Sequence, residues 1–239
     1  MRIAIIADIH GNQTALDAVL QDLAGQPGID QLVIAGDLCL NGPRPREVLR
    51  TVQALRCPVL QGNVDTEVVT ATLKKKKQPS KKHSIVDWTR EQIGKEGIEY
   101  LASLPNSYRV ENPAGSDALI VHANPLNQED AIFPTASDSR LEELLGGLEP
   151  GIGVLAFGHL HVAYTRRWRH LLLCDVGSCG LPRDEDLRAS YGILTWQGET
   201  WQAEVRRVEY DVQEVVRQLE TCGMPHAEKR IKVLLAARY

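Results

Sequence analysis

Short, uniformly apolar runs alternate with amphipathic stretches in the first part of the chain. The runs are 3–7 (IAIIA), 31–35 (QLVIA) and 58–61 (PVLQ). Each has the length and the unbroken hydrophobicity of a strand that is buried on both faces. Between the runs, apolar side chains recur at helical spacing in residues 12–25 and 45–55. This order predicts a parallel α/β start, in which ligands bind beyond the carboxyl ends of the strands.

The pattern changes twice further along the chain. Residues 66–104 are more polar and have helical spacing, which predicts a helical, cap-like insertion at about that range. From Ser107 onward, strand-like runs follow one another with short connections, which predicts hairpins and a mixed or antiparallel arrangement. The runs are 107–112, 118–123, 154–159, 163–168, 170–177, 190–196 and 200–208. Residues 211–235 have helical spacing in two pieces, which are broken at Gly223 and Pro225.

Composition places the chain among ordinary globular proteins. Its 239 residues, 43% of them apolar and 24% charged, suit a single domain over residues 1–239 with a sizeable core. No apolar run reaches the length of a membrane span, and the first residues lead into a strand-like run without the pattern of a signal peptide. We therefore expect a cytoplasmic protein without a membrane partner. The five cysteines are an odd number without a C-x-x-C pair, so free thiols are expected.

The distribution of charge adds one feature. A net charge of −4 offers no general attraction for nucleic acid, which is not expected as a partner. Residues 73–83 (LKKKKQPSKKH) depart from this balance, because six lysines lie between Lys74 and Lys82. The segment is either a solvated surface loop or a basic rim that attracts phosphate-bearing substrates. The sequence leaves both interpretations open.

Polar residues with catalytic or ligating chemistry follow the apolar runs. They are Asp8 and His10 (ADIHGN), Asp37 (AGDLCLNGP), Asn63 (QGNVD), His122 (VHANP), and His159 and His161 (FGHLHV). In extended backbone, residues two apart point to the same side, so Asp8 with His10, and His159 with His161, are expected to converge on one point. Asn63 taken alone is explained equally well as a turn residue. Seven such residues at strand ends indicate a common site.

The chemistry of these side chains indicates a metal centre. Imidazole, carboxylate and amide groups are ligands for borderline or hard divalent ions such as Mn, Fe, Co, Ni or Zn. Seven ligands exceed what one four-coordinate ion needs. The set therefore predicts two divalent ions that share one carboxylate.

The blocks D-x-H, G-D, G-N, H and G-H-x-H, which occur in this order from Asp8 to His161, resemble those of the calcineurin-like metallophosphoesterase superfamily. Residues 175–194 (DVGSCGLPRDEDLRASYGIL) also resemble the G-S-x-G-x-P-R-D segment of a bacterial and archaeal branch of small phosphodiesterases. The resemblance implies an α/β (α+β) fold, a four-layer α/β/β/α sandwich of two mixed sheets flanked by helices. It further implies one ion held by Asp8, His10 and His161, a second held by Asn63, His122 and His159, and Asp37 as the bridge between them.

The resemblance also implies how the site works. A hydroxide shared by the two ions would attack the phosphorus in line. Asn63 is the main catalytic candidate, since its amide can bind metal through oxygen and offer N–H to the phosphate. His10 and Asp65 are further candidates for a catalytic role. Asp65 is explained equally well as an N-cap of the following helix.

Two departures from the superfamily pattern narrow the substrate. The commoner block G-N-H-[DE] has a histidine that is thought to protonate the leaving group, but Val64 stands in its place and cannot donate a proton. This favours diesters with good leaving groups. Leu40 and Asn41 replace the Asp and Arg of G-D-x-x-D-R-G, which disfavours Ser/Thr protein phosphatases and symmetrical dinucleoside tetraphosphate hydrolases.

The leading hypothesis is a dinuclear metal-dependent phosphodiesterase that hydrolyses a small phosphodiester, such as a cyclic nucleotide. Manganese is the expected metal. One alternative is a phosphomonoesterase for nucleotides or phosphoproteins. Another is a non-catalytic scaffold with the same fold, and the filled ligand positions weigh against it. The partner is then a small phosphoester, and a homo-oligomer is left open.

Overall fold

The computed structural model describes residues 1–71 and 84–238, and it contains two β-sheets. The strands of the first sheet are β1 (Arg2–Ile6), β2 (Gln31–Ile34), β8 (Ala189–Trp196) and β9 (Trp201–Val208). The strands of the second are β3 (Ser107–Val110), β4 (Asp117–Val121), β5 (Ile152–Phe157), β6 (Tyr164–Trp168) and β7 (Leu171–Asp175). The helices are α1 (Gln13–Ala24), α2 (Pro45–Leu55), α3 (Asn63–Thr70), α4 (Ile85–Ser103), α5 (Asp138–Leu145), α6 (Val212–Thr221) and α7 (Ala227–Ala236).

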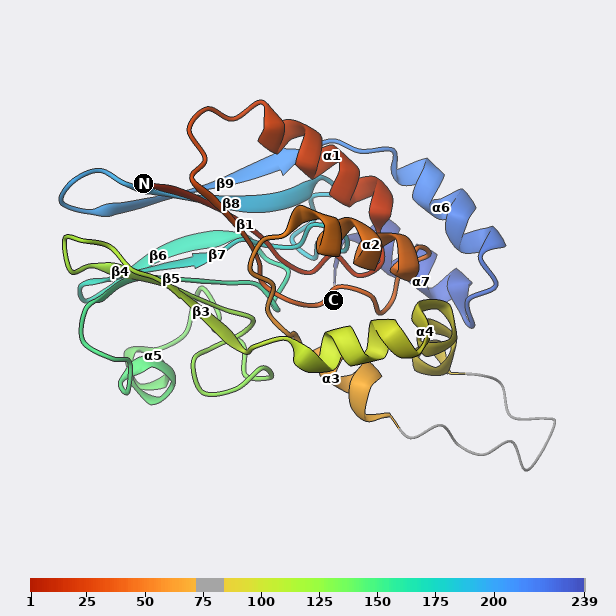
Figure 1. The fold of residues 1–239 in the computed structure, drawn as a ribbon, viewed down its shortest axis with the longest axis horizontal. Coiled ribbons are helices and arrows are strands. Elements are labelled where there is room, and N and C mark those ends of the chain that lie inside the picture. The colour runs from red at the N-terminus through yellow and green to blue at the C-terminus, as the bar shows by residue number, and fades with distance from the viewer. Residues whose placement is uncertain (72–83, 239) are drawn as a thin grey trace.

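Both sheets are mixed. The first has the order β2-β1-β8-β9, with β1 and β2 parallel and the other pairs antiparallel. The second has the order β3-β4-β5-β7-β6, with a parallel centre of β4, β5 and β7 between two antiparallel edge strands. Figure 1 shows the two sheets stacked, with α1 and α5 on opposite outer faces. The predicted four-layer sandwich is thereby confirmed.

Alternating side chains of each strand enter different apolar layers. Val154 and Ala156 of β5 pack between the two sheets, whereas Leu155 and Phe157 pack on the outer face, in the cluster that contains Leu141 of α5. This period of two is that of a strand, and here both of its faces are buried. The same arrangement explains why the strands are apolar throughout.

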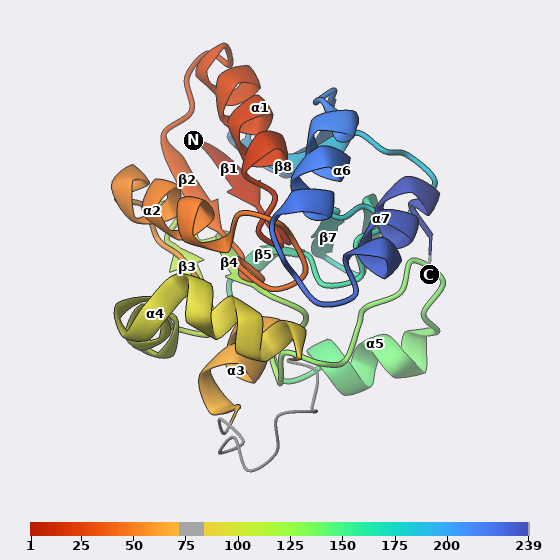
Figure 2. The same cartoon turned by 90° about the vertical axis from the view of Figure 1, so that its right-hand side faces the viewer.

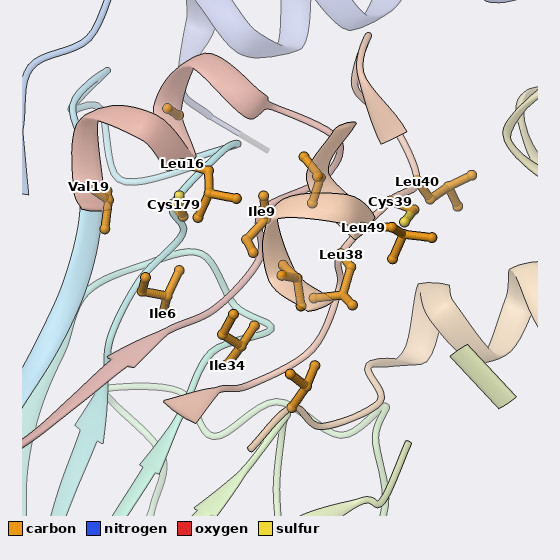
Figure 3. Packing of buried hydrophobic residues seen from close by; sticks show 14 of the residues in the cluster. Ile6, Ile9, Leu16, Val19, Ile34, Leu38, Cys39, Leu40, Leu49 and Cys179 are labelled. Atoms are coloured by element: carbon orange, nitrogen blue, oxygen red, sulfur yellow. The ribbon is translucent and has the colours of Figure 1, made fainter. Parts of the chain in front are cut away.

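Figure 3 shows the apolar layer that α1 and α2 form over the first sheet. Ile6 of β1 and Ile34 of β2 lie in it with Leu16 and Val19 of α1 and Leu49 of α2. The helical spacing of the apolar residues in the sequence is therefore the contact face of these two helices.

The predicted strand at 58–61 is wrong. Val59 forms only an isolated parallel bridge with Ile34. Immediately afterwards the Gln61 N–H donates to the carbonyl of Pro105, so the chain leaves the sheet. The run is apolar because Leu60 is fully buried between the sheets, not because it continues a ladder.

Helix α5 was not predicted from the sequence. Its signals are nevertheless present: Ser137 caps it by accepting from the Arg140 N–H, and Gly146 follows its last residue. Its apolar face is short, with Leu141, Leu144 and Leu145 buried against the second sheet. A helix of eight residues with three apolar positions is easily read as part of a long loop.

The middle of the chain is helical, as its pattern predicts. Helix α3 begins at Asn63, and α4 contains a non-helical residue at Gly94 (φ 68°), where it kinks. Ile93 and Leu101 of α4 are buried in the same layer as α2. The division into a single domain with an insertion at 66–104 stays a prediction, and the predicted basic segment falls within 72–83, outside the described residues.

All five cysteines are free, as expected. Among the helices in the described ranges, none combines the length and the apolar character that a membrane crossing requires.

Candidate metal centre

Six of the seven predicted ligands follow the carboxyl ends of parallel strands in both sheets, and the seventh, Asn63, is the first residue of α3. Strands β1 and β2 of the first sheet lead into Asp8 and Asp37, and β4 and β5 of the second lead into His122 and His159. A hydrogen bond joins the two sheets here, because the Asp8 carboxylate accepts from the backbone N–H of His159 (2.8 Å). The structure brings all seven residues to this one edge.

A first group of side chains surrounds Asp8. Asp8 Oδ1 lies 3.2 Å from His161 Nε2 and 3.8 Å from His10 Nε2, and the two imidazole nitrogens are 3.1 Å apart. Ligand atoms of Asp8, His10, His161 and Asp37 all lie within 4.8 Å of one another, and all four residues are buried. This is the compact, mixed oxygen and nitrogen set that a divalent cation binds.

A second group lies beside the first. Asn63 Oδ1 is 3.1 Å from His122 Nε2, and the His122 and His159 rings meet edge to face with their centroids 5.2 Å apart. His159 therefore faces the second group while His161 faces the first. The expectation that these two histidines converge on one point is wrong, because their side chains diverge to neighbouring groups.

Asp37 lies between the two groups. Its Oδ2 is 3.6 Å from His10 Nε2 in the first group, and its Oδ1 is 3.5 Å from His122 Nε2 in the second. Oδ1 also accepts from the Val64 N–H (3.1 Å), which fixes the orientation of the carboxylate. One carboxylate with an oxygen toward each group has the geometry of a bridge.

Backbone carbonyls orient three of the histidines. His10 Nδ1 bonds the carbonyl of Leu40 (2.8 Å), His122 Nδ1 that of Ala35 (2.8 Å) and His161 Nδ1 that of Leu181 (2.5 Å). A carbonyl only accepts, so each Nδ1 carries a proton and donates it, and each Nε2 is directed toward the centre. His159 is different, because its Nε2 bonds the carbonyl of Glu129 (2.9 Å), which leaves Nδ1 as its free ring nitrogen.

A buried carboxylate oxygen without a hydrogen-bond partner also indicates that these residues fit a cation. Asp8 Oδ1 is buried and has no hydrogen-bond partner in the described part of the chain. Buried carboxylate oxygens are almost always satisfied, and an exception calls for an ion or a donor. Here the neighbours of that oxygen are the Nε2 atoms of His161 and His10, and a carboxylate oxygen with two imidazole nitrogens is a set of ligand atoms that fits a cation.

Electrostatics in this cluster are consistent with that fit. Burial raises the pKa of Asp8, but His161 and the other nearby histidines outweigh it and leave the pKa lowered. Burial, followed by the charge of Asp8 and then Asp65, raises the pKa of Asp37 well above its ordinary value. Burial, followed by His161, lowers the pKa of His10 to about 3, so this imidazole is neutral, as a metal ligand must be.

The backbone at the site is left-handed, not extended. Positive φ angles occur at five of the seven residues: Asp8 (56°), His10 (50°), Asp37 (57°), His159 (69°) and His161 (60°). The assumption of extended backbone was therefore wrong, although Asp8 and His10 do converge. Positive φ angles are unfavourable for residues other than glycine. They concentrate at functional sites, where surrounding hydrogen bonds hold them.

Two glycines of the motifs allow this close packing. A Cβ on Gly62 would lie 2.0 Å from Asp37 Oδ1, and a Cβ on Gly158 would lie 2.2 Å from Asp8 Oδ2. No side chain can be accommodated at such distances. The glycines that precede Asn63 and His159 are thus required by the carboxylates they face.

Asp65 has a different place from the one expected. It is the third residue of α3, not its N-cap, and its carboxylate accepts from the N–H groups of Gly62 (3.1 Å), Asp37 (2.8 Å) and Leu38 (3.0 Å). The side chain is fully buried, and burial raises its pKa to about 6. Asp65 therefore holds the turn that carries Asp37.

Sequence reasoning missed the loop after β4. Glu129 bonds His159 through its carbonyl, and its Oε2 accepts from Asn63 Nδ2 (3.3 Å). The carboxylate is exposed, and no motif singles it out. The carbonyls of Leu40 and Leu181 orient two histidines, but residue type could not identify them because every residue has a backbone carbonyl.

The comparison with known proteins decides the family. A model described as the calcineurin-like phosphoesterase superfamily domain matches residues 1–199, which include every residue of the centre. The chain belongs to the calcineurin-like phosphoesterase superfamily. It is accordingly a phosphoesterase, a class of hydrolase. The superfamily is metal-dependent, and the buried Asp and His cluster could bind metal.

Relatives of this phosphoesterase span most of its length. An uncharacterized protein of Methanocaldococcus jannaschii is 30% identical over an alignment of 243 positions that covers 93% of each protein. The crystal structure of a metallophosphoesterase from Sphaerobacter thermophilus is 27% identical, covers 99% of each chain and superposes with a TM-score of 0.78. A symmetrical bis(5'-nucleosyl)-tetraphosphatase of Acidovorax ebreus is 30% identical over 151 residues, so that the chain spans about half (53%) of that relative.

Proposed function

We propose that this phosphoesterase is a dinuclear metal-dependent phosphodiesterase that acts on small phosphodiesters, such as cyclic nucleotides. The observation that carries the proposal is the position of Asp37, which turns one carboxylate oxygen toward each of two ligand groups. Manganese is the proposed metal, with Fe, Ni, Co and Zn as alternatives, and the proposed location is the cytoplasm.

The residues of the centre have different roles in the proposed reaction. Bound divalent ions supply Lewis-acid polarisation of the phosphoryl group and lower the pKa of the attacking water. Asp37 keeps the two ligand groups in register, and hydrogen bonds at Nδ1 direct the Nε2 atoms of His10, His122 and His161 inward. Asn63 Nδ2, which donates to Glu129 Oε2 in this structure, is the proposed donor for a phosphoryl oxygen.

Val64 sets a limit on the leaving group. Its N–H orients Asp37, and its side chain packs against the apolar layer under α2. No proton donor therefore stands at this position. We propose that the enzyme depends on leaving groups that are stable as anions, since the loss of a general acid costs about a hundredfold or more.

The direct test is hydrolysis of bis(4-nitrophenyl) phosphate by the Mn(II)-loaded protein. We expect turnover that a chelator abolishes and that Mn(II) restores. Asn63→Ala and His122→Ala are each expected to lower activity more than about a hundredfold without loss of fold. His170→Ala, an exposed histidine outside the centre, is the matched control and leaves activity unchanged.

A screen of substrates and metals discriminates the alternatives. No turnover of diester or monoester with Mn, Fe, Co, Ni or Zn would favour the scaffold. Preference for monoesters would favour a phosphomonoesterase. In a series of aryl diesters, the absence of a proton donor predicts that kcat falls steeply as the leaving-group pKa rises, and a flat dependence would contradict it.

A second candidate is hydrolysis of a phosphoanhydride. The tetraphosphatase match supports it, and a phosphate leaving group needs no proton from Val64. Leu40 and Asn41, which replace the Asp and Arg of the tetraphosphatase motif, weigh against it. Diadenosine tetraphosphate therefore belongs in the same screen.

A further inference from the structure

The carboxylate of Glu129 lies against the amide that is proposed to bind the phosphoryl group. Its Oε2 accepts a hydrogen bond from Asn63 Nδ2 at 3.3 Å. This nitrogen has two hydrogens, so a phosphoryl oxygen can accept from it at the same time as Glu129. Two acceptors of one amide nitrogen lie about 5 Å apart by ordinary hydrogen-bond geometry. A phosphoryl group bound to Asn63 is therefore a close neighbour of a carboxylate.

Hydrogen bonds hold the main chain of Glu129 in this place. Its N–H donates to Asn127 Oδ1 (2.9 Å), and its carbonyl bonds His159 Nε2 (2.9 Å). The preceding residue, Gln128, accepts from the Thr66 hydroxyl of α3 (2.8 Å). Figure 2 shows the green segment between β4 and α5 passing beside α3. The loop thus keeps Glu129 at the second ligand group from both sides of the residue.

Glu129 also brings a negative charge to this position. The side chain is exposed, and within the described ranges no Arg or Lys forms an ion pair with it, whereas the adjacent Asp130 pairs with Arg140 (3.3 Å). A carboxylate repels every negative charge of a neighbouring group, so two charges are disfavoured about twice as strongly as one. A separation of about 5 Å is shorter than the Debye length of about 8 Å at physiological ionic strength, so salt does not abolish this repulsion.

We propose that Glu129 is a specificity-determining residue, whose charge disfavours phosphomonoesters relative to phosphodiesters at this centre. The inference rests on the proposed function and adds a physical cause for its substrate class. A phosphomonoester carries up to two negative charges on its phosphoryl group, whereas a phosphodiester carries one. The carboxylate of Glu129 therefore opposes binding of the monoester more strongly.

The charge of Glu129 can be separated from its hydrogen bonds. In Glu129→Gln, the amide oxygen can still accept from Asn63 Nδ2, and the backbone carbonyl that bonds His159 is retained. We therefore expect this variant to keep the Mn(II) affinity of the wild type. A titration with Mn(II) checks that the variant changes the charge alone.

The test compares the binding of phenylphosphonate and methyl(phenyl)phosphinate to the full chain loaded with Mn(II). At about pH 8.5 the phosphonate carries two negative charges and the phosphinate one, and neither contains an ester bond. Titration calorimetry gives both dissociation constants. Glu129→Gln is expected to tighten phosphonate binding relative to phosphinate binding by on the order of fivefold, the effect of removing one unit charge at this distance.

Asp130→Asn is the matched control, because it removes one negative charge from the adjacent exposed position of the loop, where the carboxylate pairs with Arg140. It is expected to leave the ratio of the two dissociation constants unchanged. An unchanged ratio in Glu129→Gln, or equal changes in both variants, would overturn the inference. Binding of these ligands needs no turnover, so failure of the hydrolysis assays would count against the proposed function alone.

Discussion

At the scale of single residues, the centre depends on positions that cannot hold a side chain. Gly158 is the clearest case. Its missing Cβ leaves room for Asp8 Oδ2, which in turn accepts the N–H of His159. The carboxylate of one sheet and the backbone of the other therefore meet without an intervening side chain.

Gly158→Ala is expected to displace Asp8 and to weaken Mn(II) binding by about tenfold to a hundredfold, as loss of ligand support does. The crowding is also expected to reduce the free energy of unfolding by about 1–3 kcal/mol. Calorimetric metal titration and urea unfolding measure these effects. Gly147→Ala is the control, since a Cβ there would meet no atom within 4 Å. Unchanged Mn(II) affinity in Gly158→Ala would show that the close approach is not needed.

Asp65 can be assigned to positioning or to proton transfer by experiment. The carboxylate of Asp65 accepts from three backbone N–H groups, and the amide of Asp65→Asn has only one oxygen to replace its two. The turn at Asp37 is therefore expected to loosen, and Mn(II) affinity to fall about tenfold or more. Activity at saturating Mn(II) is expected to recover most of its wild-type value. A loss of kcat that saturating metal does not relieve would instead assign Asp65 a role in proton transfer.

The seven candidate ligands could be found from the sequence because their residue types recur directly after apolar runs, although the run before Asn63 is not a strand. The groups that orient these side chains could not be found in this way. Leu40 and Leu181 act through their carbonyls, which every residue has, and Glu129 reaches Asn63 from a loop whose course depends on tertiary packing. The left-handed backbone at Asp8 was also hidden, since residue type gives only a weak preference for it.

At the scale of elements, α1 is tied to the first sheet by one ionic cluster. Asp22 of α1 accepts from Arg206 of β9 at 2.8 and 3.0 Å and from the Tyr191 hydroxyl of β8 at 2.6 Å. These bonds join elements that are distant in sequence. The hydrogen bond with Arg206, partly opposed by burial, lowers the pKa of Asp22.

Asp22→Asn is expected to lower the free energy of unfolding at pH 7 by on the order of 1–3 kcal/mol, the value of hydrogen bonds to a charged group. Because the folded pKa of Asp22 is lowered, its contribution is present above the unfolded pKa of about 3.9 and is lost as the pH falls through the folded value. Urea unfolding at pH 7, 5 and 3 should thus show the difference between wild type and variant shrinking. Glu214→Gln, in an exposed pair on α6, is the control with a smaller effect. A difference that persists at pH 3 would contradict the ionic origin.

Elements with strong periodicity were predictable, and those fixed by tertiary contacts were not. The alternating pattern of β5 predicts a strand, and the apolar stripe of α1 predicts a helix, from the sequence alone. The run at 58–61 has the same composition as a strand, but its neighbour pairs with it at a single position. Helix α5 is the reverse case, since its cap and stop are present while its stripe is too short to stand out.

At the scale of the molecule, the centre joins the two sheets and should couple metal binding to stability. An ion that binds only the folded protein at a hundred times its dissociation constant adds about 2.7 kcal/mol. Burial and the neighbouring carboxylates raise the pKa of Asp37, so Mn(II) must displace a proton there at lower pH.

We therefore expect Mn(II) to raise the melting temperature, and this shift to shrink as the pH is lowered from 8 to 5. A carboxyl group with a raised pKa is protonated earlier on acidification, and in its neutral form it no longer attracts the ion. Melting curves with excess Mn(II) and with chelator, recorded at each pH, measure the shift. Asp37→Asn, which cannot titrate, serves as the comparison. A shift that grows toward pH 5 would contradict this coupling.

His10 and His161, whose Nε2 atoms are 3.1 Å apart, are separated by 151 positions in the chain. At a synthesis rate of about 5–20 residues per second, roughly 8–30 seconds pass between the emergence of the first and of the second. During that interval the nascent chain has Asp8 and His10, whereas β6 and β7 of the second sheet and β8 and β9 of the first follow only after His161. The first group of side chains is therefore complete only after most of the chain has been made.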